Sequence, residues 1–226
     1  MNNRKILIVI SVIACTVACV GDFVVLFVFG NRYPGYSHLY NTMSSLGATA
    51  SPVSSIVSVW WIILGFLFFL FAFGFRQAFS PANKFIQLAF WLIIIYGLGE
   101  GLGSGLFKAD TQGGFLTFSA IAHDILGGIG IAAILILPLV MQKIIHRSAN
   151  PEFHLLSKFV FIVGFILLLL FTLRFANNGE IELAKLKGLW QRLFVFLNYI
   201  YLLIIGVIMV RDNLIEGSRN KRYHTE

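Results

Sequence analysis

Six long apolar stretches, separated by short polar segments, dominate the pattern of hydrophobic and polar positions along this chain. A helix needs about 20 apolar residues to cross roughly 30 Å of hydrocarbon, and each stretch is long enough. The pattern predicts an all-α fold, an integral membrane bundle of six transmembrane helices that forms a single domain over residues 1–226. The predicted spans are residues 5–30, 53–75, 85–107, 115–141, 155–175 and 189–210.

The composition excludes an ordinary soluble domain. Hydrophobic residues make up 58% of the chain and charged residues only 12%, whereas soluble domains carry about 25% charged residues. Arg4 and Lys5 followed by apolar residues would also suit a signal peptide. However, the apolar run continues to Gly30, beyond the roughly 7–15 residues of a signal peptide's hydrophobic region. We therefore expect an uncleaved first helix.

The net charge of +7 is best explained by topology, because the basic residues flank the predicted helices. Eleven of the 17 Lys and Arg residues fall on the side of the N-terminus. This bias predicts that both termini are cytoplasmic, in a multi-pass protein of the cell (inner or plasma) membrane. The basic tail Arg219–Arg222 would lie near anionic headgroups. The expected partners are membrane lipids and not nucleic acid.

Ionisable residues inside a span are costly in lipid and usually face the interior of a bundle. Four such residues are Asp22 in the first span, Glu100 in the third, and His123 and Asp124 in the fourth. With cytoplasmic termini, all four lie in the outer halves of their helices. The fifth span is almost wholly apolar, so we expect it to face lipid.

The outer loops add further polar residues on the same side, so we predict an outward-opening polar pocket. Arg192 could bind a carboxylate such as Asp110 or Glu100 with two parallel hydrogen bonds. Alternatively, Arg192 and Asp110 only hold two loops together. The catalytic candidates are His123, Asp110 and Glu100. The predicted pocket residues are Asp22, His38, Ser45, Glu100, Asp110, His123, Asp124 and Arg192. The same side also carries Ser44, Lys108, Arg174, Glu180 and Glu182.

Glycines recur at four-residue spacing in the third span, at Gly97, Gly101 and Gly105. This spacing lets two helix backbones approach closely, either within the chain or between copies in a homo-oligomer. The same run could instead break the helix, as at the substrate sites of transporters. Glycine packing does not need a carboxylate, so Glu100 within the run calls for a separate explanation.

Several short segments resemble, in order, the motifs of the DUF998 family of bacterial and archaeal membrane proteins. The first is Tyr36–Gly47 followed by Ser51-Pro52, in the first loop. The second is Gly105-Leu-Phe-Lys-Ala-Asp110 leading to His123, in which Lys108 replaces the family's proline. The third is Gly188-Leu-Trp-Gln-Arg192. The resemblance implies that Ser45, Asp110, His123 and Arg192 are positions of interest. The first loop is more distantly similar to that of the six-helix Frag1/DRAM/Sfk1 family, which points toward lipid-related roles.

Three classes of function stay open. A lipid-associated enzyme or binder with an outer-leaflet pocket fits best, ahead of a proton-coupled small-solute transporter and a non-catalytic membrane partner or scaffold. We expect no metal and no cofactor. A zinc site needs three or four ligands on one side of the membrane, and only His38 and His123 among the histidines lie on the outer side.

The predicted topology can be tested with reporter fusions at Gly113, Asn178 and the C-terminus. We expect these positions to read outside, outside and inside, because the basic residues concentrate on the side of the termini. A C-terminal reporter active on the outside would reverse the orientation and place the polar residues on the cytoplasmic side.

Overall fold

The protein is a bundle of long helices. The computed structural model describes residues 2–148, 150–176 and 181–215, so Glu180 and the tail Arg219–Arg222 lie outside the described residues. Within these ranges six helices are long and apolar enough to cross a membrane, which confirms the predicted all-α membrane bundle. They are α1 (Asn3–Gly30), α2 (Ser54–Ala78), α3 (Lys84–Tyr96) with its continuation to Leu106, α5 (Phe118–Ile144), α6 (Pro151–Ala176) and α8 (Lys187–Val210).

Shorter elements join or extend these helices. The third helix continues through a π-helical segment, η2 (Gly97–Gly103), into α4 (Ser104–Leu106). A short π-helix, η3 (Arg211–Ile215), follows α8. The connections carry a 3₁₀ turn, η1 (Met43–Leu46), an antiparallel hairpin, β1 (Thr111–Gln112) and β2 (Phe115–Leu116), and α7 (Glu182–Lys185).

Side-chain caps mark where two of the long helices begin. The Asn83 side chain accepts hydrogen bonds from the backbone amides of Phe85 and Ile86, both at 3.0 Å. The Thr117 hydroxyl accepts one from the amide of Ala120 at 3.1 Å. Such caps satisfy amides that have no partner inside the helix. They explain why α3 and α5 start directly after these two residues.

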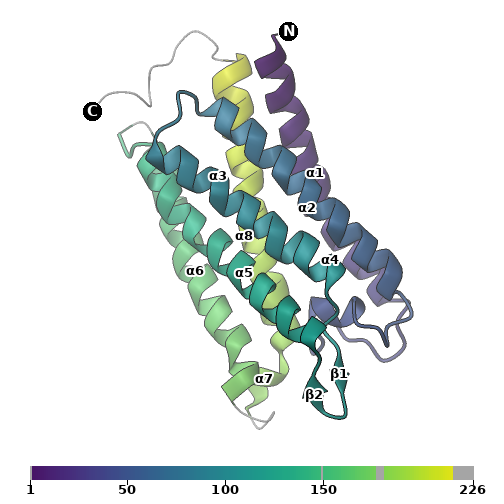
Figure 1. The fold of residues 1–226 in the computed structure, drawn as a ribbon. Coiled ribbons are helices and arrows are strands. Elements are labelled where there is room, and N and C mark those ends of the chain that lie inside the picture. The colour runs from purple at the N-terminus through teal and green to yellow at the C-terminus, as the bar shows by residue number, and fades with distance from the viewer. Residues whose placement is uncertain (1, 149, 177–180, 216–226) are drawn as a thin grey trace.

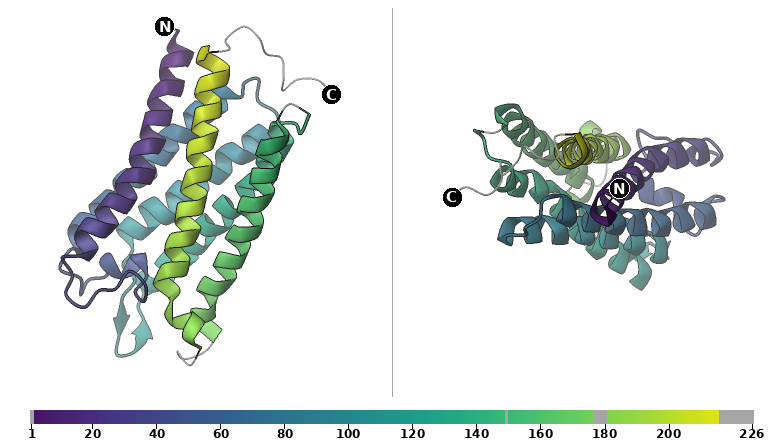
Figure 2. Two further views of the ribbon diagram at one scale, coloured as in Figure 1. Left: turned by 180° about the vertical axis from the view of Figure 1, so that it is seen from behind. Right: turned by 90° about the horizontal axis from the view of Figure 1, so that it is seen from above.

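The six long helices pack as a ring. Contacts run from α1 to α2, from α2 to α3 and η2, from these to α5, and then through α6 and α8 back to α1. Figure 1 shows the ring from the side, and Figure 2 shows from above that it is flattened into two layers. The two described chain ends lie together, where Arg4 donates hydrogen bonds to the Gln77 carbonyl (3.1 Å) and to Asn213 (3.2 Å).

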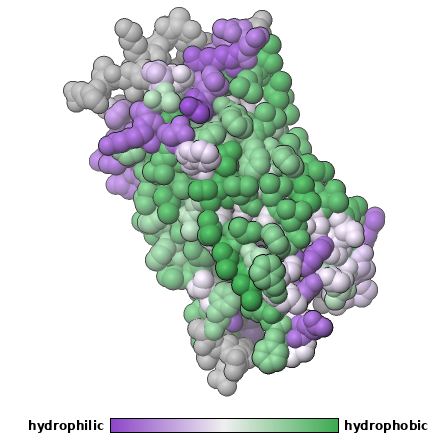
Figure 3. Space-filling model, viewed as in Figure 1, coloured by the Kyte–Doolittle hydropathy of each residue, from purple (hydrophilic) through white to green (hydrophobic). Residues whose placement is uncertain are grey.

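The two ends of the ring differ in what fills them. Toward the chain ends, large apolar side chains such as Phe68, Phe71, Phe75, Leu202 and Ile205 are fully buried. Toward the other end lie the first loop, the hairpin and α7, together with most of the buried polar residues of the long helices. The outer surface carries an apolar belt between two polar ends (Figure 3), as expected of a membrane-spanning protein.

The glycine run of the third span is π-helical and does not unwind. Its glycines pack against two helices at once. Gly97 and Gly101 lie against Gly65 of α2, whereas Gly99 lies against Gly130 of α5. Close backbone contact on both sides needs residues without a Cβ. The glycine faces of η2 are therefore occupied within the chain, and the segment holds α2 and α5 to either side of Glu100.

Replacing Gly101 with alanine should destabilise the protein. The added Cβ would come within 2.6 Å of the Gly65 nitrogen and 3.1 Å of the Trp61 carbonyl oxygen, and these backbone atoms cannot move aside. We expect the free energy of unfolding to fall by about 1–3 kcal/mol, as for other overpacked sites. Thermal unfolding in detergent measures the effect.

Gly128→Ala on α5 provides the matched control, because no atom lies within 4 Å of a Cβ placed there. We expect this variant to melt at or above the temperature of the wild type, since alanine favours helix by about 1 kcal/mol over glycine. Equal melting temperatures for wild type and Gly101→Ala would contradict the close packing of η2.

Candidate functional site

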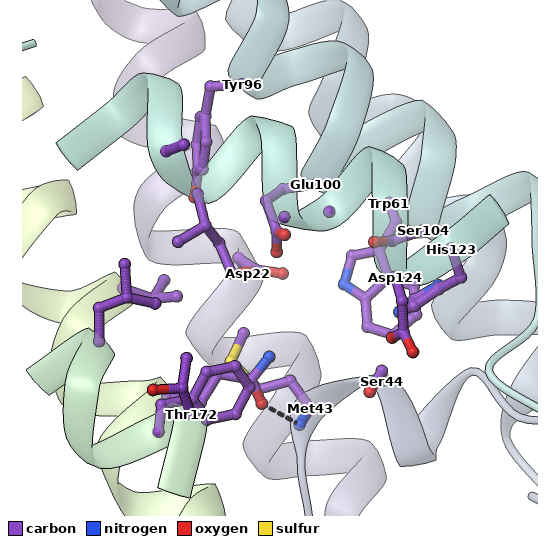
Figure 4. A pocket seen from close by; sticks show the side chains of 18 of the residues that line it. Asp22, Met43, Ser44, Trp61, Tyr96, Glu100, Ser104, His123, Asp124 and Thr172 are labelled. Carbon is purple, nitrogen blue, oxygen red and sulfur yellow. Dashed lines mark hydrogen bonds between the residues drawn. The ribbon is translucent and has the colours of Figure 1, made fainter. Parts of the chain in front are cut away.

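A cavity of about 290 Å³ lies inside the ring at the end that carries the loops. All six long helices and the first loop contribute to its lining, and Figure 4 shows many of these side chains. The wall is largely apolar and includes Leu64, Ile131 and Val195. The polar and charged lining residues are Asp22, Ser44, Tyr96, Glu100, Ser104, His123, Asp124, Thr172, Arg174, Gln191 and Tyr199.

Four of the eight pocket residues predicted from the sequence line this cavity. These are Asp22, Glu100, His123 and Asp124, which are expected from the sequence to face the interior of the bundle. The other four, His38, Ser45, Asp110 and Arg192, lie outside the lining and take part in loop contacts. The structure thus separates the predicted set into a cavity group and a loop group.

Asp22 ties three helices together at the side of the cavity. Its carboxylate is 1% exposed. It accepts hydrogen bonds from Nε1 of Trp60 on α2 at 3.1 Å and from the hydroxyl of Tyr199 on α8 at 3.0 Å. Because hydrogen bonds to an ionised group are among the stronger ones, these two donors hold α1, α2 and α8 in register. Asp22 is therefore both a lining residue and a structural one.

Glu100 occupies the middle of η2, where the wide turn directs its side chain into the cavity (Figure 4). Its carboxylate makes no hydrogen bond and no ion pair with any residue that the structure describes. Asp22 and Arg174 are its electrostatic neighbours. A carboxylate in a largely apolar bundle without a donor is costly, so Glu100 is available to a bound group.

His123 is oriented by the backbone. It is 7% exposed, and its Nδ1 lies 3.0 Å from the carbonyl oxygen of Phe107. A carbonyl only accepts hydrogen bonds, so Nδ1 carries the proton and, in the neutral ring, Nε2 carries the lone pair. This arrangement leaves Nε2 as a proton acceptor at the cavity. The backbone, and not a carboxylate, is therefore the partner of Nδ1.

Arg174 is the cation of the cavity. It lies near the end of α6, and its guanidinium carbon sits 3.9 Å from the ring centroid of Phe171 and 4.4 Å from that of Phe175. Its Nε is buried without a hydrogen-bond partner. Glu100 and Asp124 interact with it electrostatically. Arg174 is not among the pocket residues predicted from the sequence, although a lone charge near the end of an apolar span is a signal for it.

Arg192 does not pair with a carboxylate, so that interpretation of the sequence is corrected. Its guanidinium donates to the carbonyl oxygens of His38 (2.7 Å), Asn41 (3.0 Å) and Gly188 (2.8 Å), and to the hydroxyl of Tyr36. These partners occupy both terminal nitrogens of the guanidinium, and no carboxylate of the described residues is bonded to it. Arg192 holds the first loop against the start of α8.

Asp110 likewise connects two loops. It accepts hydrogen bonds from the amide of Thr49 at 2.8 Å and from its hydroxyl at 2.5 Å. Ser45 lies within the first loop, where its hydroxyl is 2.9 Å from that of Thr42. The alternative interpretation, in which Asp110 and Arg192 only hold loops together, agrees with their observed contacts.

Lys108, which replaces the proline of the resembled motif, fastens the third span to α2. Its ammonium donates to the hydroxyls of Ser54 at 2.7 Å and Ser58 at 2.6 Å. Burial lowers the pKa of Lys108 because it takes the ammonium out of water, and the Asp110 carboxylate opposes this shift. A lysine can therefore take the place of the proline at this bend.

Further lining residues carried no clear signal in the sequence. Tyr96 and Tyr199 are buried aromatic residues in long apolar runs. Gln191 closes the cavity by accepting a hydrogen bond from the amide of Met43 at 2.8 Å. Within residues 2–148, 150–176 and 181–215, no group of three or more His, Cys, Asp or Glu side chains is arranged to hold a metal ion.

His38 makes the stability of the first loop depend on pH. Its ring packs between Phe27 and Tyr36, and neither ring nitrogen has a hydrogen-bond partner. Burial, followed by the neighbouring Arg192 charge, lowers the pKa of His38. The folded state thus favours the neutral ring. Its contribution to stability is present above about pH 6.5, the unfolded value, and is lost as the pH falls from there toward the lower folded value.

We expect His38→Gln to reduce the fall in melting temperature between pH 7.5 and pH 5.5, since glutamine takes up no proton. The comparison is a thermal unfolding series in detergent with wild type and with His146→Gln, a change at an exposed position at the opposite end. His146→Gln should retain the full fall. The same pH dependence in wild type and His38→Gln would show that His38 is not the group responsible.

Comparisons with known proteins place the chain in a family. No curated protein and no solved structure matches it. The family of proteins of unknown function termed DUF998 matches over residues 16–208. The match includes every predicted pocket residue and the whole lining of the cavity. With six apolar helices and a match over most of its length, this multi-pass membrane protein belongs to the DUF998 family.

Proposed function

We propose that this protein binds a membrane amphiphile, with the polar head in the cavity and the apolar chains leaving between α5 and α6. The observation that carries the proposal is a cavity that holds charged groups and opens through the flank of the bundle. Asp124, Gly128 and Thr172 are exposed lining residues, and Phe175 is 69% exposed. These four residues belong to α5 and α6, so the opening lies in the flank of the bundle.

The arrangement of α5 and α6 supports a lateral entrance. The two helices lie close together near their connection at residues 145–150 and diverge toward the end with the cavity (Figure 1). A volume of about 290 Å³ is just below the roughly 300–1,000 Å³ of small-molecule sites. The cavity therefore suits the head of a lipid, while its chains remain among the surrounding lipids.

The orientation of the protein is part of this proposal. With cytoplasmic termini in a cell membrane, the first loop and the hairpin would lie outside and the cavity would be level with the outer leaflet. Exposed apolar residues of the hairpin region, Phe115, Leu116 and Phe118, fit a position at the membrane interface. Of the three catalytic candidates, Glu100 and His123 would face the bound head, whereas Asp110 would support the loops.

Transport has less support than binding. A transporter needs a polar path through both halves of the bundle, whereas beyond the cavity the described interior is filled mainly by apolar side chains such as Phe68, Phe71 and Leu202. The carboxylate of Glu100 in a π-helical segment is the feature that would suit a proton-coupled carrier. Self-association through glycine faces stays a prediction, and the faces of η2 are not free for it.

Filling the cavity tests the proposal. Gly128 lines the cavity, and no atom lies within 4 Å of the point where a Cβ would be at this residue. Gly128→Trp should therefore occupy the opening without a backbone clash. We expect the amount of lipid retained after detergent washing, measured by native mass spectrometry, to fall ~10-fold, equivalent to about 1.4 kcal/mol in binding free energy.

Ile129→Trp is the matched control, because Ile129 is the next residue on α5, is 52% exposed and does not line the cavity. This variant should retain lipid as the wild type does. If Gly128→Trp and Ile129→Trp retained equal amounts, the lipid would be bound to the outer surface and the proposed function would be wrong.

A further inference from the structure

The charged groups of the cavity are electrostatic neighbours, but within the described ranges no ion pair joins them. Arg174 forms no ion pair with any residue that the structure describes, and its buried Nε lacks an acceptor. A buried donor without a partner is costly, and more so when it is charged. The Phe171 and Phe175 rings stabilise the cation from the side but accept no conventional hydrogen bond. Arg174 is therefore prepared for an anionic group with several oxygens.

Two of the three acidic residues of the cavity lack a hydrogen-bond donor within the described part of the chain. Asp22 is satisfied by Trp60 and Tyr199. Glu100 and Asp124 have no hydrogen-bond donor among the described residues, and both face the cavity (Figure 4). His123, which also lines the cavity and interacts electrostatically with Asp124, adds Nε2 as a third acceptor. Carboxylates and imidazole nitrogens accept hydrogen bonds, so this part of the wall is prepared for a donor with positive charge.

We propose that the head bound in the cavity is zwitterionic, with a phosphate that binds Arg174 and a primary ammonium that binds Glu100 and Asp124. This inference rests on the proposed function and names its ligand class, an amine-bearing phospholipid. The planar guanidinium can give a phosphate two parallel hydrogen bonds. A primary ammonium has three donors, enough for both carboxylates and for Nε2 of His123.

Other lipid heads would leave part of the site unmatched. The head of phosphatidylglycerol supplies the phosphate but no cation, so Glu100 and Asp124 would face an anion. A head with only a positive charge would leave Arg174 without an acceptor. Phosphatidylcholine has the correct charges, but its quaternary nitrogen has no N–H to donate to a carboxylate. The primary amine is therefore the group that should distinguish the preferred lipid.

The test measures binding of short-chain phosphatidylethanolamine, phosphatidylcholine and phosphatidylglycerol to the full-length protein in detergent by native mass spectrometry. We expect phosphatidylethanolamine to bind ~10-fold more tightly than the other two. Soluble phosphoethanolamine is added separately to distinguish a lipid from a free head. It should bind at least ~10-fold more weakly than the lipid, because it has no chains to hold it at the flank opening. Equal affinities would overturn the inference that the ligand is a membrane lipid.

Two variants test recognition of the ammonium and of the phosphate separately. Glu100→Gln should remove most of the preference for phosphatidylethanolamine and leave phosphatidylglycerol binding unchanged or tighter. Arg174→Gln should weaken both lipids. Glu182→Gln, at an exposed carboxylate of α7 outside the cavity, is the control and should change neither. Melting temperatures are measured for each variant, and binding is compared only among those that remain folded; Asp124→Asn replaces Glu100→Gln if the latter unfolds.

Different outcomes test the inference about the lipid head and the proposed function of the cavity. Similar affinities for the three lipids, or a preference for phosphatidylethanolamine that Glu100→Gln or its substitute preserves, would overturn the inference about the head. The proposed function would still stand if Gly128→Trp reduced binding of all three lipids. Binding unaffected by Gly128→Trp would overturn both.

Discussion

The backbone contacts of η2 determine much of the rest of the structure. Gly97 and Gly101 bring the third span against α2, and Gly99 brings it against α5. Neither contact leaves room for a Cβ. The third span can therefore approach α2 and α5 this closely only because glycines lie on both of the faces that it turns toward them. The π-helical geometry keeps both faces in contact while turning Glu100 toward the interior. The same seven residues therefore close one side of the ring and supply a carboxylate to the cavity.

The two halves of the bundle follow different physical rules. Toward the chain ends, aromatic and aliphatic side chains fill the interior, and dispersion and close packing hold the helices together. Toward the loops, hydrogen bonds contribute more to holding the helices together. Asp22 links α1, α2 and α8, and Arg192 holds the first loop on α8. A cavity can persist at this end because the helices around it are fixed by polar contacts and not by a filled centre.

How far the sequence predicts the site depends on the kind of contact involved. The six spans and the cavity position of Asp22, Glu100, His123 and Asp124 follow from hydropathy, because isolated ionisable residues in a span turn inward. The roles of Arg192 and Asp110 could not be derived in this way. Their partners are mainly backbone groups, which every residue possesses and which leave no pattern in the sequence.

Arg174 and Tyr199 show a second limit to what the sequence predicts. The fifth span is apolar around its circumference, so hydropathy does not show which way Arg174 faces, and the hydroxyl of Tyr199 is identified as the partner of Asp22 only when α8 is placed beside α1.

Closure of the ring by α8 has a consequence for biosynthesis. Helices enter the membrane in the order in which they are translated, and α8 is the last of the six. Until it arrives, the Asp22 carboxylate lacks Tyr199 as a donor, and the cavity lacks the wall formed by Gln191, Val195 and Tyr199. A nascent chain with five inserted helices thus holds an incompletely solvated carboxylate inside the bilayer. The final insertion step therefore both completes the wall of the cavity and supplies the second donor to this carboxylate.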